Sequence, residues 1–239
     1  MKVRVLFFAY LRDVTGAPAV EVVVAEGARV RDVQAELVRR WPDLDGQLRR
    51  IPVVVDGKVV ELDAMVREGS EVVWLPPVGG GAPDGIPDPG GPGGPGLVLA
   101  RIRREALDPA RLISEVSAPN CGGITLFVGE VRNHDDAGPV RALDYEVYEP
   151  LARAQLTRVA EEALARWPAA RIAVEHRVGR LEVGEAAVAV AVACPHRAEA
   201  FDCCRFVIDR VKEAVPIWKR EEGPAGGRWL PGHEFKPRA

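Results

Sequence analysis

Pro76-Pro-Val-Gly-Gly-Gly81 opens a stretch that continues to Gly96, and 16 of its 21 residues are glycine or proline. The stretch contains no aromatic and no basic residue, so it cannot bury enough apolar surface to offset the entropy lost on ordering. A segment of this composition is typical of a linker. We therefore expect two folded domains, residues 1–81 and 97–239, joined by a Gly/Pro-rich linker over residues 82–96.

The first six residues of this stretch have a second interpretation. They follow the strand-like segment Glu71-Val-Val-Trp-Leu75 and form a thin tail, almost without side chains, that ends at Gly81. A glycine tail can enter a narrow channel in which bulkier residues would clash. The residues alone leave open whether 79–81 are such a tail or only the start of the linker.

Composition limits the classes of function. With 239 residues, 47% hydrophobic and 28% charged, the chain has an ordinary globular composition and is long enough for two small domains. Residues 1–81 carry 11 basic and 12 acidic side chains and residues 97–239 carry 21 of each, so neither domain has the basic excess typical of nucleic-acid binding. No apolar run approaches the roughly 18 residues of a membrane span, and the N-terminus begins with a strand pattern, not a signal peptide. We expect a cytoplasmic protein that binds neither nucleic acid nor membrane.

The side chains suited to catalysis are unevenly distributed. All four cysteines and all four histidines lie after the linker, so chemistry near neutral pH would have to use residues 97–239, apart from carboxylates. The cysteines show no CxxC spacing, which favours reduced thiols over disulfides or a zinc site. Cys194 is interpreted as a core residue, although a thiolate nucleophile stays open. His134 has no second ligand at metal-binding spacing, and His176 and His233 receive no role.

The first domain has the pattern of a small mixed sheet with one helix. The helix is expected at 30–41, where apolar residues recur every three or four positions and Pro42 follows. Strands are expected at 2–8, 20–24, 51–55, 59–60 and 72–75. The order ββαβββ in about 80 residues predicts a β-grasp, ubiquitin-like fold.

The second domain is expected to be an α+β layered sandwich. Its strands are expected at 97–103, 122–131, 140–147, 171–178, 186–194 and 217–221, and its helices at 108–116, 150–167 and 198–215. The strand at 186–194 is apolar on both faces and should be central in its sheet. The helix at 198–215 is expected to bury the stripe Phe201, Cys204, Ile208, Val211 and Val215.

Basic groups occur at three places in the second domain. His196 and Arg197 lie where the central strand turns into a helix, Arg132 follows the 122–131 strand, and Lys212 and Lys219 lie on either side of Pro216. If they converge, they form a cationic pocket for an anionic substrate. Two lysines held close together lower each other's pKa, and either could then act as general acid–base or stabilise an oxyanion. Each group taken singly is also typical of a cap or a solvated surface, so the residues alone support an anion-binding pocket.

Two segments of the first domain are similar to a known family. The opening Val5-Leu-Phe-Phe-Ala-Tyr-Leu-Arg12 and the ending Pro76-Pro-Val-Gly-Gly-Gly81 resemble the small, sulfur-carrying subunit of molybdopterin synthase. The resemblance implies a thiocarboxylate on the terminal glycine, which by position is Gly81. In this chain Ala82 and a second domain follow, so Gly81 has no free carboxylate.

Three segments of the second domain resemble the large subunit of the same family: Phe127-Val-Gly-Glu-Val-Arg-Asn-His134, His196-Arg197, and Val211-Lys-Glu-Ala-Val-Pro-Ile-Trp-Lys-Arg-Glu221. The resemblance implies catalysis by Lys212 and Lys219 without a metal or cofactor, with Lys212 closest to the glycine tail, and a homodimer formed through residues 97–239. A family arginine expected after Arg228-Trp229 is not evident, and His233 falls near its position. The residues implied to bind substrate are Arg132, His196, Arg197, Lys212, Lys219, Arg220 and Glu221.

The resemblance implies a complete reaction. Sulfur passes from a Gly81 thiocarboxylate to cyclic pyranopterin monophosphate and gives the molybdopterin dithiolene. An activating enzyme must load the tail, and a chain end at Gly81 requires cleavage before Ala82. Two alternatives stay open: an uncleaved fusion that acts as a ubiquitin-like binding or scaffold protein, and a sulfur carrier for another pathway such as thiamine synthesis.

Overall fold

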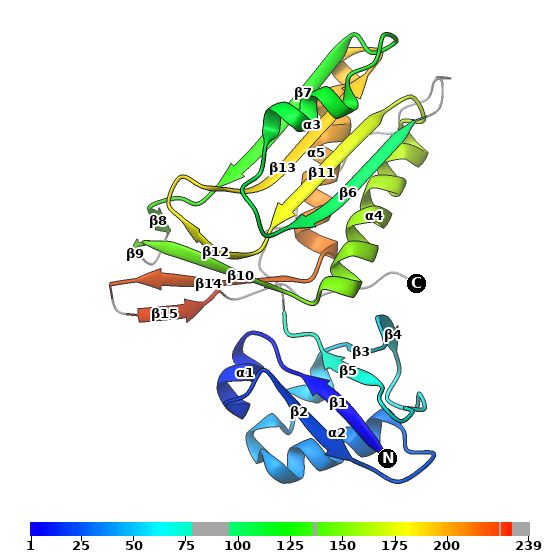
Figure 1. Cartoon of the computed structure of the whole chain (residues 1–239), viewed down its shortest axis with the longest axis vertical. Helices are drawn as coiled ribbons and strands as arrows, with labels where there is room; N and C mark the ends of the chain where they lie inside the picture. Colours follow the sequence, from blue (N-terminus) through cyan, green and yellow to red (C-terminus); the bar gives the residue numbers. More distant parts are fainter. Residues whose placement is uncertain (78–95, 136–137, 225, 231–239) are drawn as a thin grey trace.

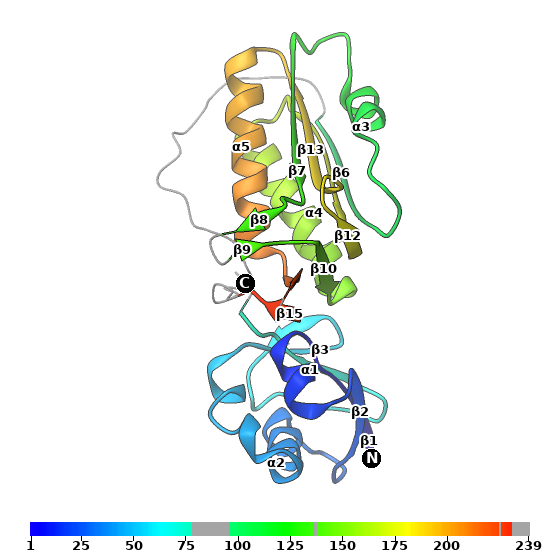
Figure 2. The same cartoon turned by 90° about the vertical axis from the view of Figure 1, so that its left-hand side faces the viewer.

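The computed structural model describes residues 1–77, 96–135, 138–224 and 226–230, and it contains two domains (Figures 1 and 2). Each domain has its own hydrophobic core. The first domain lies at the end of the second domain that carries β10, β14 and β15. Residues 82–95 of the expected linker and residues 79–81 lie outside the described residues.

The first domain is the expected β-grasp. Its sheet has the order β2-β1-β5-β3-β4, with β1 and β5 parallel. Helix α2 buries its apolar positions Val30, Val33 and Leu37, and it ends before Pro42, which cannot continue it. The elements are β1 (Lys2–Leu6), α1 (Tyr10–Thr15), β2 (Ala19–Val23), α2 (Val30–Arg40), η1 (Pro42–Leu44), η2 (Leu48–Arg50), β3 (Val53–Val55), β4 (Lys58–Val60) and β5 (Glu71–Trp74).

The second domain confirms the expected α+β layers and adds short strands that the pattern did not predict. Its elements are β6 (Leu97–Arg103), α3 (Pro109–Val116), β7 (Gly123–Glu130), β8 (His134–Asp135), β9 (Gly138–Pro139), β10 (Ala142–Val147), α4 (Glu149–Arg166), β11 (Arg171–Arg177), β12 (Gly179–Glu182), β13 (Ala186–Cys194), α5 (Arg197–Ala214), β14 (Ile217–Gly223) and β15 (Gly226–Trp229). The main sheet has the order β6-β11-β13-β7 and a smaller sheet the order β12-β10-β14-β15. Helices α4 and α5 cover one face of the main sheet and α3 the other (Figure 2).

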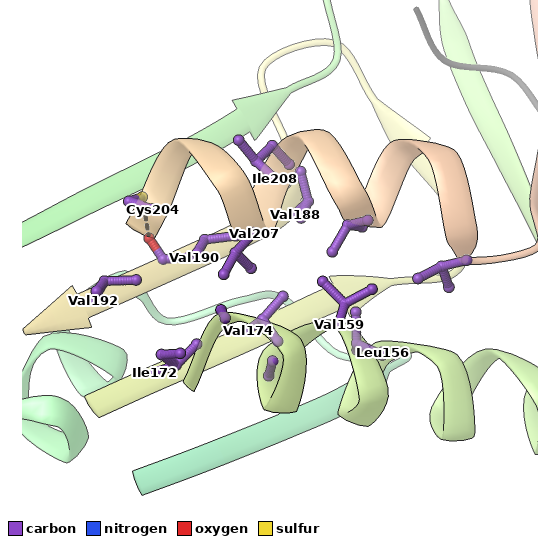
Figure 3. Close-up of a cluster of buried hydrophobic side chains, with 14 of the residues drawn as sticks. Leu156, Val159, Ile172, Val174, Val188, Val190, Val192, Cys204, Val207 and Ile208 are labelled. Carbon is purple, nitrogen blue, oxygen red and sulfur yellow. Dashed lines mark hydrogen bonds between the residues drawn. The ribbon is translucent and has the colours of Figure 1, made fainter. Parts of the chain in front are cut away.

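The main core lies between the main sheet and the helices α4 and α5 (Figure 3). Leu156 and Val159 of α4, Val207 of α5 and Val174 of β11 all belong to this core (Figure 3). All four are at most 1% exposed, and burying a side chain of this size contributes about 1.5–3 kcal/mol. As expected, β13 lies inside the sheet and is buried along its length from its second residue.

Strand β11 buries two neighbouring polar residues on opposite faces, because successive side chains of a strand alternate. Glu175 is fully buried beneath α3, whereas His176 points to the α4 and α5 side. Three arginines donate to the Glu175 carboxylate: Arg101 at 3.0 Å, Arg103 at 3.1 Å and Arg111 at 2.7 Å. These contacts compensate the buried charge.

The expected buried stripe of α5 is wrong at one position. Phe201 is 63% exposed, whereas Cys204, Ile208, Val211 and Val215 are buried. The face of α5 that meets the sheet is centred on Ala200, Cys203 and Val207. Phe201 directly follows Ala200 and is therefore rotated by about 100° out of the contact.

Candidate active site

A pocket of about 380 Å³ lies where the C-terminal end of α5 meets the smaller sheet. Its walls come from α5, β10, β11, β14 and the segment after β7. Because it brings basic side chains together from segments far apart in the sequence, it is the candidate active site. Its charged lining residues are Glu130, Arg132, Asp135, Lys212, Lys219 and Glu221.

Pro216 separates the two elements that carry the lysines. Lys212 lies in the last turn of α5, where the negative end of the helix dipole favours a cation. Proline cannot continue the helix, and the chain enters β14. Alternation along β14 then turns Lys219 and Glu221 toward the pocket and Trp218 to the other side. The local sequence thus brings both lysines to one pocket.

The surroundings of Lys219 disfavour its charged form. Burial lowers the pKa of Lys219 most strongly, because it removes water from around the ammonium. The positive charges of Lys212 and Arg132 lower this pKa further, whereas the Glu221 carboxylate opposes the shift. The direction agrees with the one expected from two neighbouring lysines, although burial is the larger cause, and a lowered pKa makes the ammonium a better proton donor.

Arg228 of β15 pairs with two acidic residues of the pocket lining. Its Nη2 donates to Asp135 Oδ2 and to Glu221 Oε2, both at 2.8 Å. Burial raises the pKa of Glu221 and the Asp135 carboxylate adds to this effect, whereas Arg228 opposes it. Arg228 thereby offsets negative charge that would otherwise counter the basic groups of the pocket.

Two further residues that line the pocket were not predicted from the sequence. The rings of His176 on β11 and Tyr145 on β10 contact edge to face, with centroids 5.2 Å apart. Their exposed fractions are only 6% and 7%. His176 alternates in step with Ile172 and Val174 on the buried face of β11, and this periodicity was the signal that could have identified it.

Because His176 is buried, we expect the folded protein to lose stability in acid. Burial lowers its pKa to about 4 from the ordinary 6.5, so between these values the unfolded chain binds a proton that the folded chain does not. The contribution is complete above pH 6.5 and falls by about 3 kcal/mol as the pH approaches 4. Urea unfolding at pH 7 and pH 4.5 should show a smaller acid loss for His176→Phe than for wild type. Equal acid losses would contradict this assignment.

The structure does not bring His196 and Arg197 into this pocket within one copy of the chain. They lie at the start of α5, and Lys212 follows Arg197 by 15 residues, or about 22 Å along a helix. Arg220 does not line the pocket either, because alternation along β14 turns it away from Lys219. Of the residues expected to bind substrate or act in catalysis, the pocket contains Arg132, Lys212, Lys219 and Glu221.

The first domain packs against the far side of β14 from the pocket. The Phe8 ring stacks on Trp218, with centroids 4.8 Å apart and planes at 17°. Trp218 Nε1–H donates to the carbonyl oxygen of Pro76 at 2.9 Å. Arg12 Nη1 pairs with Glu146 Oε1 of β10 at 2.6 Å. An aromatic stack, a buried hydrogen bond and an ion pair therefore join the domains.

The bond between Trp218 and Pro76 shows where the glycine tail begins. Trp218 directly precedes Lys219 in β14, so the tail begins beside the strand that forms one pocket wall. Gly81, the expected sulfur donor, lies outside the described residues. His233, which falls near the position of the missing family arginine, lies outside them as well.

Within the described part of the chain, no group of three or more histidine, cysteine or carboxylate side chains is arranged to hold a metal ion. The four cysteines are free thiols. None of the helices in that part is both long and apolar enough to cross a membrane.

Comparison with known proteins finds two families in the chain. The model of the MoaE protein family matches residues 102–214, and that of the ThiS family matches residues 5–81. The molybdopterin synthase catalytic subunit of Halalkalibacterium halodurans is 41% identical over 120 residues, which are 50% of this chain and 77% of that protein. The catalytic subunit of Pyrococcus abyssi is 41% identical over 125 residues, or 52% of this chain and 84% of that protein.

Solved structures agree with these relatives. The crystal structure of molybdopterin synthase from Staphylococcus aureus matches with a TM-score of 0.54 and 32% identity, over 56% of this chain and 97% of that one. The MoaE protein of Burkholderia ambifaria matches with a TM-score of 0.51 and 34% identity, over 59% of this chain and 93% of that one. The chain therefore belongs to the molybdopterin synthase catalytic-subunit family, sulfurtransferases of molybdenum cofactor biosynthesis, and carries a ThiS-family β-grasp domain ahead of the catalytic domain.

Proposed function

We propose that this chain contains both parts of a molybdopterin synthase, a sulfur carrier and the domain that uses the sulfur. The donor is a thiocarboxylate at Gly81, the acceptor is cyclic pyranopterin monophosphate, and two transfers give the dithiolene. The observation that supports this most is that Arg132, Lys212 and Lys219 meet in one pocket beside β14, the strand against which the carrier tail begins.

The pocket supplies the groups that this reaction needs. Arg132 provides a fixed positive charge for the phosphate of the substrate. Lys219, whose pKa is lowered, donates and accepts protons at the carbons that receive sulfur. Lys212 stabilises the negative charge that develops when the thiocarboxylate adds. In this proposal Lys212 is also the lysine closest to the tail.

The proposal requires the tail to reach these groups from its anchor at Pro76. Pro76 is hydrogen-bonded to Trp218, and Gly81 is five positions further along the chain. Five extended residues span at most about 17 Å. Trp218 and Lys219 point to opposite faces of the smaller sheet, so delivery of sulfur to Lys219 requires, in this proposal, a tail that passes around the edge of this sheet. Small residues at 79–81 suit such a narrow path.

Weakening the Trp218 contact should weaken carrier docking. Trp218→Phe keeps a ring that can stack on Phe8 but removes the donor to Pro76. Losing one buried hydrogen bond, with its acceptor left unpaired, costs about 1–2 kcal/mol. Calorimetry of separately expressed residues 1–81 and 97–239 should therefore show affinity reduced about 5–30-fold.

Trp167→Phe is the matched control for this measurement. Trp167 is also buried in the second domain, and its Nε1 has no hydrogen-bond partner among the described residues. Its replacement should leave carrier affinity unchanged. Equal affinity of the Trp218→Phe domain and wild type would contradict the docking contact.

A thiocarboxylate at Gly81 requires a chain end there. We place the domain boundaries at residues 1–81 and 97–239, with cleavage between Gly81 and Ala82, at the start of the Gly/Pro-rich segment. A separate adenylating and sulfur-donating enzyme then loads the new end. Intact mass spectrometry of active native material should detect a fragment that ends at Gly81, and finding only full-length chain in active enzyme would refute the cleavage.

The position of His196 and Arg197 supports a homodimer through the second domain. Both lie on the molecule's surface region around β7, an edge strand of the main sheet. Ile124 and Leu126 of β7 expose 41% and 37% of their surface, and Phe201 of α5, a helix that packs against β7, exposes 63%. A second copy that covers this region would bring its own basic pair to the interface. Sedimentation of Phe201→Asp should show monomer where wild type shows dimer, and a monomeric wild type at micromolar concentration would exclude the proposal.

Consumption of the thiocarboxylate tests the function itself. Residues 1–81 prepared with a Gly81 thiocarboxylate should convert to the carboxylate only when both residues 97–239 and the pterin substrate are present. Mass spectrometry resolves the replacement of sulfur by oxygen. Conversion that does not depend on the second domain would favour the scaffold interpretation or another sulfur-carrier pathway.

A further inference from the structure

Arg228 joins two segments that each bring one basic residue into the pocket. Its Nη2 donates to Asp135 Oδ2 of β8 and to Glu221 Oε2 of β14, both at 2.8 Å. Asp135 follows Arg132 by three positions, and Glu221 follows Lys219 by two on the same face of β14. One guanidinium therefore links the segment of Arg132 to the strand of Lys219.

The two carboxylates that share this nitrogen are close together. Their bound oxygens are at most 5.6 Å apart, which is twice the 2.8 Å between each oxygen and Nη2. The side chains of Asp135 and Glu221 are only 20% and 10% exposed, so water screens their repulsion poorly. Burial raises the pKa of Glu221 and the Asp135 carboxylate adds to this effect, whereas Arg228 lowers it. The contact with Arg228 thus favours the ionised form of Glu221.

Lys219 lies beside this acidic pair without joining it. Burial and the charge of Lys212 lower the pKa of Lys219, whereas the charge of Glu221 raises it. Among the side chains that the structure describes, however, Lys219 and Glu221 form no ion pair with each other, and Glu221 is bound to Arg228 instead. Arg228 thus occupies a carboxylate that would otherwise be available to Lys219.

The backbone holds both ends of this bridge in place. Arg228 lies directly opposite Glu221 in the antiparallel pair of β15 and β14. Asp135 lies opposite Gly138 in the β8–β9 pair, and its Oδ1 accepts from the Gly138 N–H at 3.0 Å, which leaves Oδ2 for Arg228. The Arg228 side chain is itself 51% exposed, so its replacement removes these contacts and little packing.

We propose that Arg228 is a positioning residue of the active site, which holds the segment of Arg132 against β14 and keeps the Glu221 carboxylate from pairing with Lys219. The Lys219 ammonium is then free to contact the substrate, beside an Arg132 whose segment is anchored. The inference rests on the proposed function only for the identity of this substrate. The contacts themselves belong to the chain without substrate.

Lys219 is the cation that we expect Glu221 to approach when Arg228 is removed. The two residues are two positions apart on one strand face, or about 7 Å along the strand, within reach of their side chains. The other charged or titratable groups that act on Lys219 or Glu221 come from other elements: Lys212 on α5, Arg132 after β7, Asp135 on β8, Tyr145 on β10, His176 on β11 and Arg228 on β15.

Two variants of Arg228 and one control separate this role from a general effect of losing a surface arginine. Arg228→Met removes the charge and the donors, whereas Arg228→Lys keeps a charge that can bind both carboxylates. Arg180→Met is the matched control. Arg180 lies on β12 of the same sheet, is 53% exposed, and also binds two carboxylates, Glu182 at 2.9 Å and Glu222 of β14, but it does not line the pocket.

The titration of Lys219 is measured without substrate. The full chain contains five lysines, so carbon-13 labelling of the lysine ε-carbons resolves them, with Lys219 assigned from a Lys219→Arg variant. Loss of the Arg228 charge and release of the Glu221 carboxylate both favour the charged form of Lys219. Arg228→Met should therefore raise the pKa of Lys219 by about one unit. Arg228→Lys should stay within a few tenths of a unit of wild type, and Arg180→Met should match it.

The sulfuration assay gives a second readout. Arg228→Met should reduce kcat about 10-fold, because Lys219 gives up its proton less readily, and should raise KM about threefold, because the segment of Arg132 loses its anchor. Arg228→Lys should recover most of both. A role in folding alone would reduce the amount of active enzyme and leave KM and the Lys219 titration as in wild type.

Wild-type titration of Lys219 in Arg228→Met would overturn the proposal, and so would an equal shift in Arg180→Met. If Arg228→Met does not fold, Arg228→Gln decides instead, because it keeps an N–H donor for one carboxylate but removes the charge. It should shift the pKa of Lys219 in the same direction, and an unshifted pKa would again overturn the proposal. Titrations that agree with these expectations in a chain that forms no dithiolene would refute the proposed function and leave the role of Arg228 intact.

Discussion

Lys219→Ala is expected to reduce dithiolene formation by at least about 100-fold, the usual effect of removing a general acid–base or a group that stabilises developing charge. Lys219 is the lysine whose pKa the pocket lowers, through burial and through its neighbours Lys212 and Arg132. Because the interaction acts mainly in the transition state, kcat should fall with little change in KM. Single-turnover assays with saturating thiocarboxylated carrier measure this directly.

Two controls accompany this variant. Lys58→Ala removes an exposed lysine of β4 in the first domain, outside the pocket, and should leave the rate unchanged. Lys219→Arg keeps the positive charge but not a pKa suited to proton exchange, so it should stay well below wild type. Activity of Lys219→Ala within threefold of wild type would remove this residue from the mechanism.

Glu175→Ala is expected to cost about 3–5 kcal/mol of folding stability, as does removal of one partner from a buried ion cluster. The carboxylate is fully buried, and Arg101, Arg103 and Arg111 all donate to it. Its loss leaves three partly buried guanidinium groups without their shared acceptor. The melting temperature of the second domain should fall by about 10 °C.

Glu161→Ala is the matched control for Glu175. Glu161 is an exposed residue of α4 in the same domain, and its replacement should change the stability by no more than about 0.5 kcal/mol. Urea unfolding of both variants at pH 7 compares them under one condition. If Glu175→Ala lowers the free energy of unfolding by less than 1 kcal/mol, the ion pairs of this cluster do no more than offset the cost of burying its charges.

The sequence predicted those features that depend on local chemistry. The Gly/Pro stretch after Leu75 marked the boundary between the strand and helix patterns of the two domains. The order of strands and one helix before this stretch identified the β-grasp. Pro216 between two lysines predicted a helix end followed by a strand, and the structure places both side chains in one pocket. Arg132 joins them because it follows a strand that ends at the same place.

Other features depend on packing across the fold, which periodicity does not report. His176 and Tyr145 come from different sheets and become neighbours only when β10 crosses the end of β11. Phe201 has helical spacing with buried residues but lies about 100° from the centre of the contact face. Arg197 shares α5 with Lys212 and His196 directly precedes this helix, and a motif in the sequence does not convey that 15 residues of helix separate Arg197 from Lys212.

The central claim is that the glycine tail delivers sulfur to the pocket of Arg132, Lys212 and Lys219. The most direct measurement is dithiolene formation from cyclic pyranopterin monophosphate, residues 97–239, and residues 1–81 that end in a Gly81 thiocarboxylate. We predict two sulfur atoms incorporated per substrate, and none when the carrier ends in an ordinary carboxylate. Thiocarboxylated carrier, intact second domain and substrate that together yield no dithiolene would contradict the account.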